Sequence, residues 1–237
     1  MKTEGRNAVL ELLKSDKNID KLLLEKNPQG SLKSIFAEAR KRNIRVQFVD
    51  RKVLDKESEE GRHQGVISFC SDFKYSSLDD IINSRSSDGG FVIICDGIED
   101  VHNLGSVIRV AECAGADGVV IPSTNSASVT DAVVRISAGA ANHMKVAKVN
   151  SVNRTVDELK KNGYWLYALE ADGSNIYDAD LTGNIAIVVG GEDSGVRRLT
   201  REKCDFTLSI PLKGKVNSLN ASVALGIAAY EAVRKRQ

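Results

Sequence analysis

The sequence predicts an α/β protein with a parallel sheet in its larger, C-terminal part and a smaller α/β module before it. Short runs of aliphatic and β-branched residues alternate with helical patterns, and this alternation is typical of a largely parallel sheet covered on both faces. The 237 residues are enough for two modest domains. Between the two parts, residues 71–90 are rich in Ser, Asp and Gly and lose apolar periodicity. We therefore expect a first domain at residues 1–72, a linker at residues 73–89 and a second domain at residues 90–237.

The expected elements follow in order along the chain. In the first domain, GRNAVLELLKS and SLKSIFAEARKR predict helices at 5–15 and 31–42, while apolar runs predict strands at 19–25, 45–50 and 65–70. Within the linker we expect one helical turn around Leu78–Ile82. In the second domain, β-rich runs predict strands at 91–95, 118–122, 144–149, 164–170, 185–191 and 206–211.

Composition and charge exclude several classes of protein. Hydrophobic residues make up 42% and charged residues 27%, and no apolar run reaches the roughly 18 residues of a membrane-spanning helix. Charges interrupt the N-terminal MKTEGRNAVLELL, where a signal peptide would need an apolar core, so we expect a cytoplasmic protein. The four cysteines and three histidines are scattered, without the spacing of a zinc site, and we expect no metal.

The positive charge of the chain is concentrated in its first third. The net charge is +1, but residues 1–70 carry 15 Lys and Arg against 11 Asp and Glu. This part includes ARKRNIR at residues 39–45, which could contact phosphates, although such a run is usually a solvated helix face.

Three loops follow predicted strands at the edge where ligands bind in such a sheet. The first contains Asn103, a favoured N-cap for a helix starting near Leu104, and Arg109 about two turns later. Taken by itself, Arg109 would be interpreted as an ordinary solvated arginine on a helix. The second is GGEDSG at 190–195, whose glycines allow close backbone approach; it matches neither a phosphate loop nor a dinucleotide fingerprint, and a simple strand-to-helix turn remains an alternative. The third is KVNSLN at 215–220, where Ser218 is placed to cap the last helix.

Three segments in this order carry a specific resemblance: NLGSVIR, IVVGGEDSGVRRLT and SIPLKGKVNSLNASVALGIAAYEA. Together they closely resemble the three motifs of the SpoU/TrmH family of RNA ribose 2'-O-methyltransferases, within the SPOUT superfamily, over about residues 91–236. The first domain looks like the small ribosomal-protein-like substrate-binding domain of many members. The whole pattern most resembles the bacterial subfamily that methylates a guanosine in 23S ribosomal RNA.

The resemblance implies a SPOUT fold with a deep C-terminal trefoil knot, S-adenosylmethionine as cofactor, an RNA substrate, a homodimer and no metal. Gly190, Ile210 and Leu219 match the family's cofactor contacts. Arg109 matches its catalytic arginine, which we expect to position the substrate and stabilise charge, because arginine is too basic to serve as a base. By the same match, Asn103 would orient the hydroxyl or Arg109. Glu192 would order its loop or pair with Arg109.

Two further residues, Ser218 and Asn220, match the third motif and would help to shape the pocket. Members often have Gly after the second-motif Glu, where this chain has Asp193. Arg135, Arg197 and Arg198 would contact RNA phosphates or form surface ion pairs.

Other functions remain as alternatives. The chain could act on transfer RNA, could confer antibiotic resistance through ribosomal RNA, or could bind RNA without turnover. A nicotinamide dehydrogenase is disfavoured because the glycine fingerprint is missing.

Overall fold

The computed structural model describes residues 2–15, 17, 19–42, 44–70, 73–86, 88–192 and 194–237. The chain divides into two compact units, Met1–Lys74 (unit 1) and Tyr75–Gln237 (unit 2). Within the described residues, no helix is long and apolar enough to cross a membrane.

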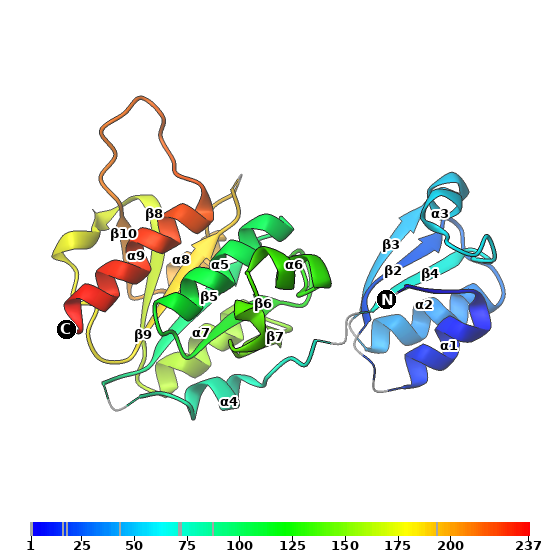
Figure 1. Ribbon diagram of the computed structural model, residues 1–237, viewed down its shortest axis with the longest axis horizontal. Helices are drawn as coiled ribbons and strands as arrows, with labels where there is room; N and C mark the ends of the chain where they lie inside the picture. The colour runs from blue at the N-terminus through cyan, green and yellow to red at the C-terminus, as the bar shows by residue number, and fades with distance from the viewer. Residues whose placement is uncertain are drawn as a thin grey trace. The chain divides into compact units, whose positions relative to one another are not determined.

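Unit 1 is a four-stranded mixed sheet with helices on both faces (Figure 1). The strand order is β1-β4-β2-β3, and only β2 and β3 run parallel. The strands are β1 (Lys2–Glu4), β2 (Ile19–Glu25), β3 (Arg45–Val49) and β4 (Val66–Cys70), and the helices are α1 (Arg6–Lys14), α2 (Ser31–Lys41) and α3 (Arg51–Glu57). The three strands and two helices expected from the sequence are confirmed, whereas β1 and α3 were not predicted.

The alternation of side chains along β2 explains the two faces of this sheet. Leu22 and Leu24 lie in the main core with residues of α1 and α2, whereas Leu23 lies in a smaller core with Leu54 of α3. Successive residues of a strand point to opposite faces, so the unbroken apolar run LLL serves both cores.

Two cations of the basic run at residues 39–45, Lys41 and Arg42, have partners inside unit 1. Arg42 donates hydrogen bonds from its guanidinium to the carbonyl oxygens of Leu13 (2.6 Å), in the last turn of α1, and of Ser15 (2.9 Å) and Lys17 (3.2 Å), just after this helix. Lys41 forms an ion pair with Glu38 at 3.0 Å. Asn43 lies outside the described residues.

Unit 2 contains a six-stranded sheet in which every described strand pair is parallel, in the order β10-β8-β9-β5-β6-β7. All six predicted strands are confirmed: β5 (Phe91–Asp96), β6 (Gly118–Pro122), β7 (Val146–Val149), β8 (Trp165–Asn175), β9 (Ile185–Gly190) and β10 (Phe206–Ser209). The helices are α4 (Leu78–Ile82), α5 (Val101–Cys113), α6 (Asp131–Ile136), α7 (Val152–Lys161), α8 (Arg198–Lys203) and α9 (Ala221–Lys235), with short 3-10 turns at Ala140–Asn142 and Ile176–Asp178.

Helices cover both faces of this sheet (Figure 1). Helices α4 and α7 pack on the face that carries Val92 and Ile94 of β5. Helix α9 packs against α5 and β9 on the other face. The two central strands, β5 and β9, are therefore buried along their whole length.

The segment expected to be a linker belongs to unit 2 from Tyr75 onward. Its helical turn is confirmed as α4, but Ile81 and Ile82 are buried in the core of unit 2. Gly118 makes room for this packing, because a Cβ added there would lie 2.5 Å from Cδ1 of Ile81.

The end of α9 is anchored to two loops of unit 2. Arg236 donates hydrogen bonds to the carbonyl oxygens of Gly90 (3.1 Å), Leu181 (3.2 Å) and Gly183 (2.7 Å). Its guanidinium also lies 5.2 Å from the ring centre of Phe91. These contacts attach the C-terminal end of α9 to the residues that precede strands β5 and β9.

Candidate active site

Helix α5 begins one turn earlier than the sequence suggested. Its N-cap is Asp100, whose carboxylate accepts hydrogen bonds from the backbone N–H of His102 (2.8 Å) and of Asn103 (2.9 Å). The expectation that Asn103 caps this helix is therefore wrong. Because Asp100 does the capping, the buried side chain of Asn103 is available for contacts outside the helix.

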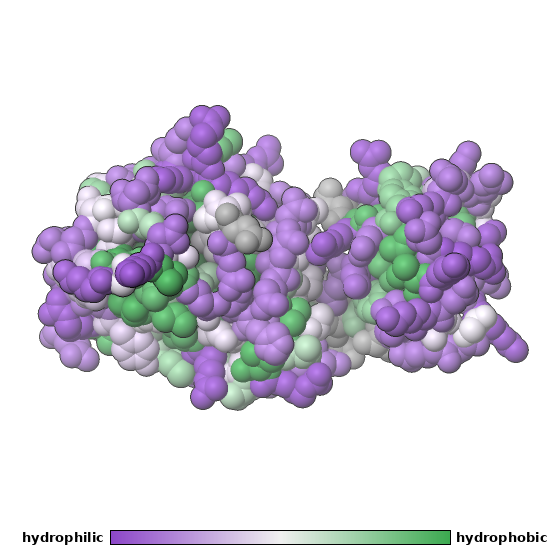
Figure 2. Space-filling model, turned by 90° about the horizontal axis from the view of Figure 1, so that it is seen from above, coloured by the Kyte–Doolittle hydropathy of each residue, from purple (hydrophilic) through white to green (hydrophobic). Residues whose placement is uncertain are grey.

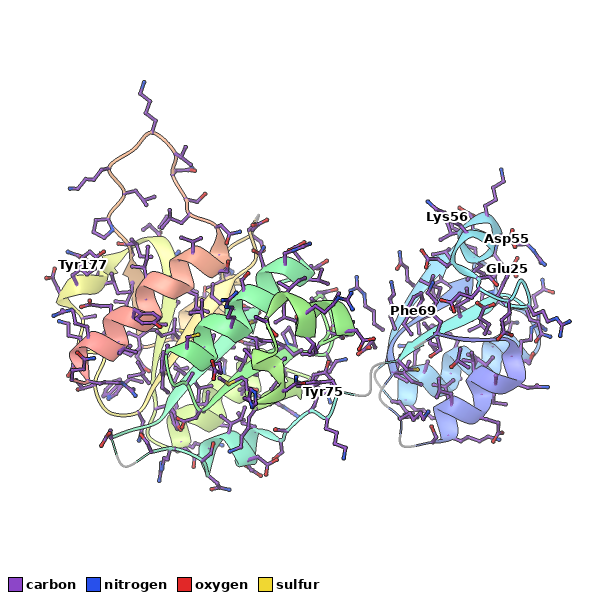
Figure 3. The ribbon with its side chains drawn as sticks, in the orientation of Figure 1. Glu25, Asp55, Lys56, Phe69, Tyr75 and Tyr177 are labelled. Atoms are coloured by element: carbon purple, nitrogen blue, oxygen red, sulfur yellow. The ribbon has the colours of Figure 1, made fainter. Side chains whose placement is uncertain are left out.

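Helix α9 is capped by Asn220 rather than by Ser218, so that expectation is also wrong. Oδ1 of Asn220 accepts hydrogen bonds from the backbone N–H of Ser222 (3.0 Å) and of Val223 (3.3 Å). Ser218 lies two residues before the cap, in the exposed loop between β10 and α9. This loop extends away from the sheet, and its side chains reach outward (Figure 3).

The amide group of Asn220 joins three loops at the carboxyl edge of the sheet. Its Nδ2 donates hydrogen bonds to Oδ1 of Asn103 (2.9 Å) and to Oε1 of Glu192 (2.7 Å). These residues follow β5, β9 and β10, and they are 28 to 117 positions away from Asn220 in the sequence. The structure thus brings three of the five expected catalytic residues into one network.

The glycine-rich loop after β9 folds back on itself. The N–H of Gly195 donates to the carbonyl oxygen of Gly191 at 2.9 Å. A Cβ added at Gly190 would lie 1.9 Å from the carbonyl carbon of Gly195, so this close backbone approach excludes any side chain there. Glu170, which the sequence did not single out, holds the far end of the loop by accepting a 2.5 Å hydrogen bond from the N–H of Val196.

A buried carboxylate fixes the start of α8. Asp96 at the end of β5 is fully buried, and it accepts a 3.0 Å hydrogen bond from the N–H of Arg197. The Arg197 guanidinium lies 3.3 Å from the other oxygen of Asp96, and Arg198 pairs with Glu202 at 2.8 Å. Both arginines therefore form ion pairs within the protein. Asp96 could have been singled out from the sequence, because it is an acidic residue directly after a fully apolar predicted strand.

Two neighbouring cavities lie at this edge. The first, about 200 Å³, contains all three expected cofactor residues together with Glu192 and Ser218; its lining is Leu169, Glu170, Ala171, Val189, Gly190, Gly191, Glu192, Gly195, Ile210, Leu212, Asn217, Ser218, Leu219, Ala221 and Ala224. The second, about 330 Å³, is lined by Gly97, Ile98, Glu99, Asp100, Asn103, Gly191, Glu192, Ser194 and Ala221. The two share Gly191, Glu192 and Ala221, so the network of Asn220 lies where they meet.

Arg109 is separated from this network along α5. It lies six residues after Asn103, a rise of about 9 Å along the helix axis, and its side chain is exposed. Within the described part of the chain, its guanidinium has no ion pair or hydrogen bond, and Glu192 contacts Asn220 instead. Arg135 on α6 is likewise exposed and unpaired there. Asp193 lies outside the described residues.

The histidines and carboxylates do not assemble a metal site among the described residues, where no group of three or more metal-binding side chains is found. His63 is an example of a satisfied histidine. It is buried in unit 1, its Nε2 lies 2.9 Å from Oδ1 of Asp55, and its Nδ1 accepts a 3.0 Å hydrogen bond from the N–H of Gly65.

These features define an α/β protein with two cavities at the carboxyl ends of a parallel sheet, the place where ligands bind in such folds, and with an N-terminal module. Residues 90–230 match the SpoU rRNA Methylase family, and residues 3–76 match the domain described as RNA 2'-O ribose methyltransferase substrate binding. The chain belongs to the SpoU rRNA methylase family, a family of S-adenosylmethionine-dependent RNA methyltransferases. The resemblance seen in the three sequence motifs is thereby confirmed.

Individual relatives support this assignment over most of the chain. A protein of Bacillus subtilis (strain 168) assigned to the TrmH family of tRNA/rRNA methyltransferases is 40% identical over 237 residues, which cover 98% of this chain and 94% of the relative. The AdoMet-bound rRNA methyltransferase from Sinorhizobium meliloti has the same fold, with a TM-score of 0.59 at 22% identity, covering 98% of this chain and 86% of its own. The TrmH/SpoU tRNA modifying enzyme of A. aeolicus has a TM-score of 0.59 at 26% identity, covering 67% and 80% of the two chains.

The residues of the first cavity fit the cofactor of this family. Leu169, Val189 and Ile210 provide apolar surface against which a flat adenine ring can pack, and the glycine loop provides unobstructed backbone groups. Glu192 and Ser218 add polar side chains to the same lining.

Proposed function

We propose that this protein transfers the methyl group of S-adenosylmethionine to a ribose 2'-hydroxyl of RNA in the cytoplasm, and that its target is a guanosine of 23S ribosomal RNA. The observation that carries this proposal is the hydrogen-bonded junction of Asn103, Glu192 and Asn220 between two cavities. One cavity is lined by the residues that match the cofactor contacts, and the other is open to an acceptor.

The reaction is an in-line displacement, which requires alignment of the attacking hydroxyl and removal of its proton. When bound, S-adenosylmethionine supplies a methyl group activated by a sulfonium. Gly190, Ile210 and Leu219 would hold it in the first cavity, with Ser218 beside them.

The polar junction would arrange the acceptor. Asn220 holds Asn103 and Glu192 in fixed positions beside the second cavity, where their remaining lone pairs and donors can orient a ribose hydroxyl. Arg109 is free of ion pairs within the described residues, and it would contact the substrate phosphate as a permanent cation.

The choice of ribosomal RNA over transfer RNA rests on unit 1. The S. meliloti rRNA methyltransferase aligns with 98% of this chain, whereas the A. aeolicus tRNA enzyme aligns with 67%. We take unit 1 as the domain that binds the RNA substrate, in line with the match of residues 3–76.

The test is transfer of labelled methyl from S-adenosylmethionine to unmodified ribosomal RNA and transfer RNA, with the product mapped to the nucleotide. We expect one 2'-O-methylguanosine in large-subunit RNA. Label in transfer RNA alone would refute the proposed target but keep the chemistry. Cofactor binding without label in any RNA would favour a protein that binds RNA without turnover.

We also propose that the protein is a homodimer that uses the outer face of α9. Val223 and Tyr230 are each 52% exposed and lie seven residues apart, on one stripe of this helix. Large apolar side chains on one stripe are suited to burial against a second copy. Sedimentation equilibrium should give twice the chain mass, and Tyr230→Glu should shift it towards the monomer; a monomeric wild-type protein would refute this.

The trefoil knot is a further part of the proposal. It is supported by the packing of α9 against β9 and α5 and by the contact of its N-cap with the loop after β9. A chain pulled from its two ends would stop short of its full contour length of about 3.3–3.6 Å per residue, because a tightened knot retains some chain. Full extension would rule the knot out.

A further inference from the structure

Unit 1 carries a cluster of two aromatic rings and an arginine on its surface. Phe36 of α2 and Phe48 of β3 meet edge to face, with ring centres 5.2 Å apart and an interplanar angle of 61°. The guanidinium of Arg40 lies 5.8 Å from the ring centre of Phe36. We refer to Phe36, Phe48 and Arg40 as the β3–α2 cluster.

Phe48 is an aromatic side chain that is exposed to solvent. Its side chain is 41% exposed, although it sits at the end of a strand whose Val46 packs against the core of the unit. Strand β3 is at the edge of the sheet and pairs with β2. Among the described residues of unit 1, the other exposed large apolar side chain is Val53 of α3. Figure 2 shows hydrophobic residues at the surface of this unit among hydrophilic ones.

Two exposed cations without an acidic partner among the residues that the structure describes, Lys33 and Arg40, lie on the same helix as Phe36. Lys33, Phe36 and Arg40 are three and four residues apart along α2, so they lie on one face of the helix. Both cations are exposed, and within the described residues neither has an ion pair or a hydrogen bond to another group. This contrasts with Lys41 and Arg42 of the same segment, which bind Glu38 and carbonyl oxygens at the C-terminal end of α1.

An exposed aromatic ring beside free cations has the chemistry of a stacking site for nucleic acid. Every base has a π face that can stack on an aromatic side chain, and nearby Lys and Arg attract the backbone. A base-paired helix does not offer such a face, because its bases are stacked on each other and A-form RNA is recognised mainly through phosphates and 2'-hydroxyls.

We propose that the β3–α2 cluster is a stacking platform for an unpaired base of the RNA substrate, with Phe48 against the base and with Lys33 and Arg40 against the adjoining phosphates. This inference rests on the proposed function, in which RNA is the substrate, and adds the face of unit 1 that receives it. The favoured feature of the substrate is a single-stranded segment, such as a loop or a bulge.

The first experiment measures binding of the full-length protein to a labelled single-stranded RNA of about 12 nucleotides, a length within the range of single-strand binding sites. Phe48→Ala should weaken binding about 5- to 150-fold, the range lost when a base–aromatic stack is truncated. Phe48→Leu, which keeps apolar bulk, should weaken it similarly, and Phe48→Trp should retain it.

The matched control is Phe206→Ala in unit 2. Phe206 is 47% exposed and also contacts aromatic rings, with centres 5.9 Å from that of Trp165 and 5.2 Å from that of Tyr167. The charged residue next to Phe206, Asp205, forms an ion pair with Lys160 at 2.7 Å. We expect RNA binding by this variant to be unchanged.

A second readout tests the role of charge. For single strands, each phosphate contact contributes about 0.7 to the slope of log K against log salt concentration, so Lys33→Gln should reduce the slope by about that amount. The control is Lys14→Gln, because Lys14 is exposed on α1 and already pairs with Glu11 at 2.9 Å.

The outcomes separate this inference from the proposed function. In methyl transfer to ribosomal RNA, Phe48→Leu should raise KM for RNA while leaving kcat and cofactor binding unchanged. The platform would be refuted if Phe48→Leu bound single-stranded RNA as tightly as the wild-type protein does. It would also be refuted if this variant lost as much affinity for a blunt RNA duplex as for the single strand. Absence of methyl transfer by the wild-type protein would refute the proposed function, and the binding data would still decide about the platform.

Discussion

Replacement of Asn220 separates the two tasks of this side chain. Its Oδ1 caps α9, and its Nδ2 bridges Asn103 and Glu192. Asn220→Ala removes both functions. Asn220→Ser keeps a capping oxygen, since serine is among the preferred N-cap residues, but it cannot bridge the two loops.

The expected magnitudes follow from these contacts. Loss of the cap costs about 1 kcal/mol. Loss of the bridge removes two hydrogen bonds, each worth about 1 kcal/mol net. Asn220→Ala should therefore destabilise the protein by about 3 kcal/mol and Asn220→Ser by about 2 kcal/mol. At roughly 2–4 °C per kcal/mol for a protein of this size, Tm should fall by about 6–12 °C and 4–8 °C.

The assays are thermal unfolding and methyl transfer, measured on both variants with the wild-type protein. Both variants should lose most methyl transfer, because the loops after β5 and β9 are no longer joined. Equal Tm values for the Ser and Ala variants would show that the cap contributes nothing. A Ser variant with wild-type activity would show that the bridge does not organise the site, and the reasoning would fail.

Three further results are expected. Arg109→Ala should fold and bind S-adenosylmethionine normally but lose about 100-fold or more in kcat, the usual effect of removing a charge-stabilising donor, and wild-type turnover would remove Arg109 from the mechanism. Gly190→Ala forces a Cβ to within 1.9 Å of the Gly195 carbonyl carbon, so it should cost about 2 kcal/mol or more and abolish cofactor binding measured by calorimetry; unchanged binding would contradict the tight loop crossing. A thiol reagent at pH 7 should label exposed Cys113 first, because burial raises the pKa of Cys95 to about 12 and leaves almost no thiolate there; mass spectrometry of the modified peptides would show the opposite order if Cys95 were accessible.

The strands of unit 2 could be predicted because a parallel sheet covered on both faces selects unbroken apolar runs. FVIIC and IAIVVG are such runs, and they became the central strands β5 and β9. The edge strand β1 has only three residues, all partly exposed, so KTE carries no such pattern.

The N-caps of α5 and α9 could not be chosen from the sequence, because two residues of types favoured as N-caps lie near the start of each of these helices. Asp100 and Asn103 are three residues apart, and Ser218 and Asn220 are two apart. The bond between Asn103 and Asn220 spans 117 positions, and a contact at that separation leaves no local signal.

The burial of α4, in the segment expected to be a linker, could not be foreseen for a related reason. Ile81 and Ile82 are isolated in a polar segment, and the packing of Ile81 depends on the space left by Gly118, far along the chain. The resemblance singled out Gly190, Ile210 and Leu219, which line the first cavity, whereas Glu170 is recognised only by its hydrogen bond to the loop after β9.

The anchored end of α9 has a consequence for the order of events during protein synthesis. Unit 1 precedes the sheet of unit 2, so it can leave the ribosome and fold while the rest is still being translated. Asn220 and Arg236, which complete the junction and tie α9 to Gly90, follow every strand of that sheet. Under the proposed function, a nascent chain would therefore bind RNA before it could modify it, and a chain truncated shortly before residue 220 would bind the substrate without turnover.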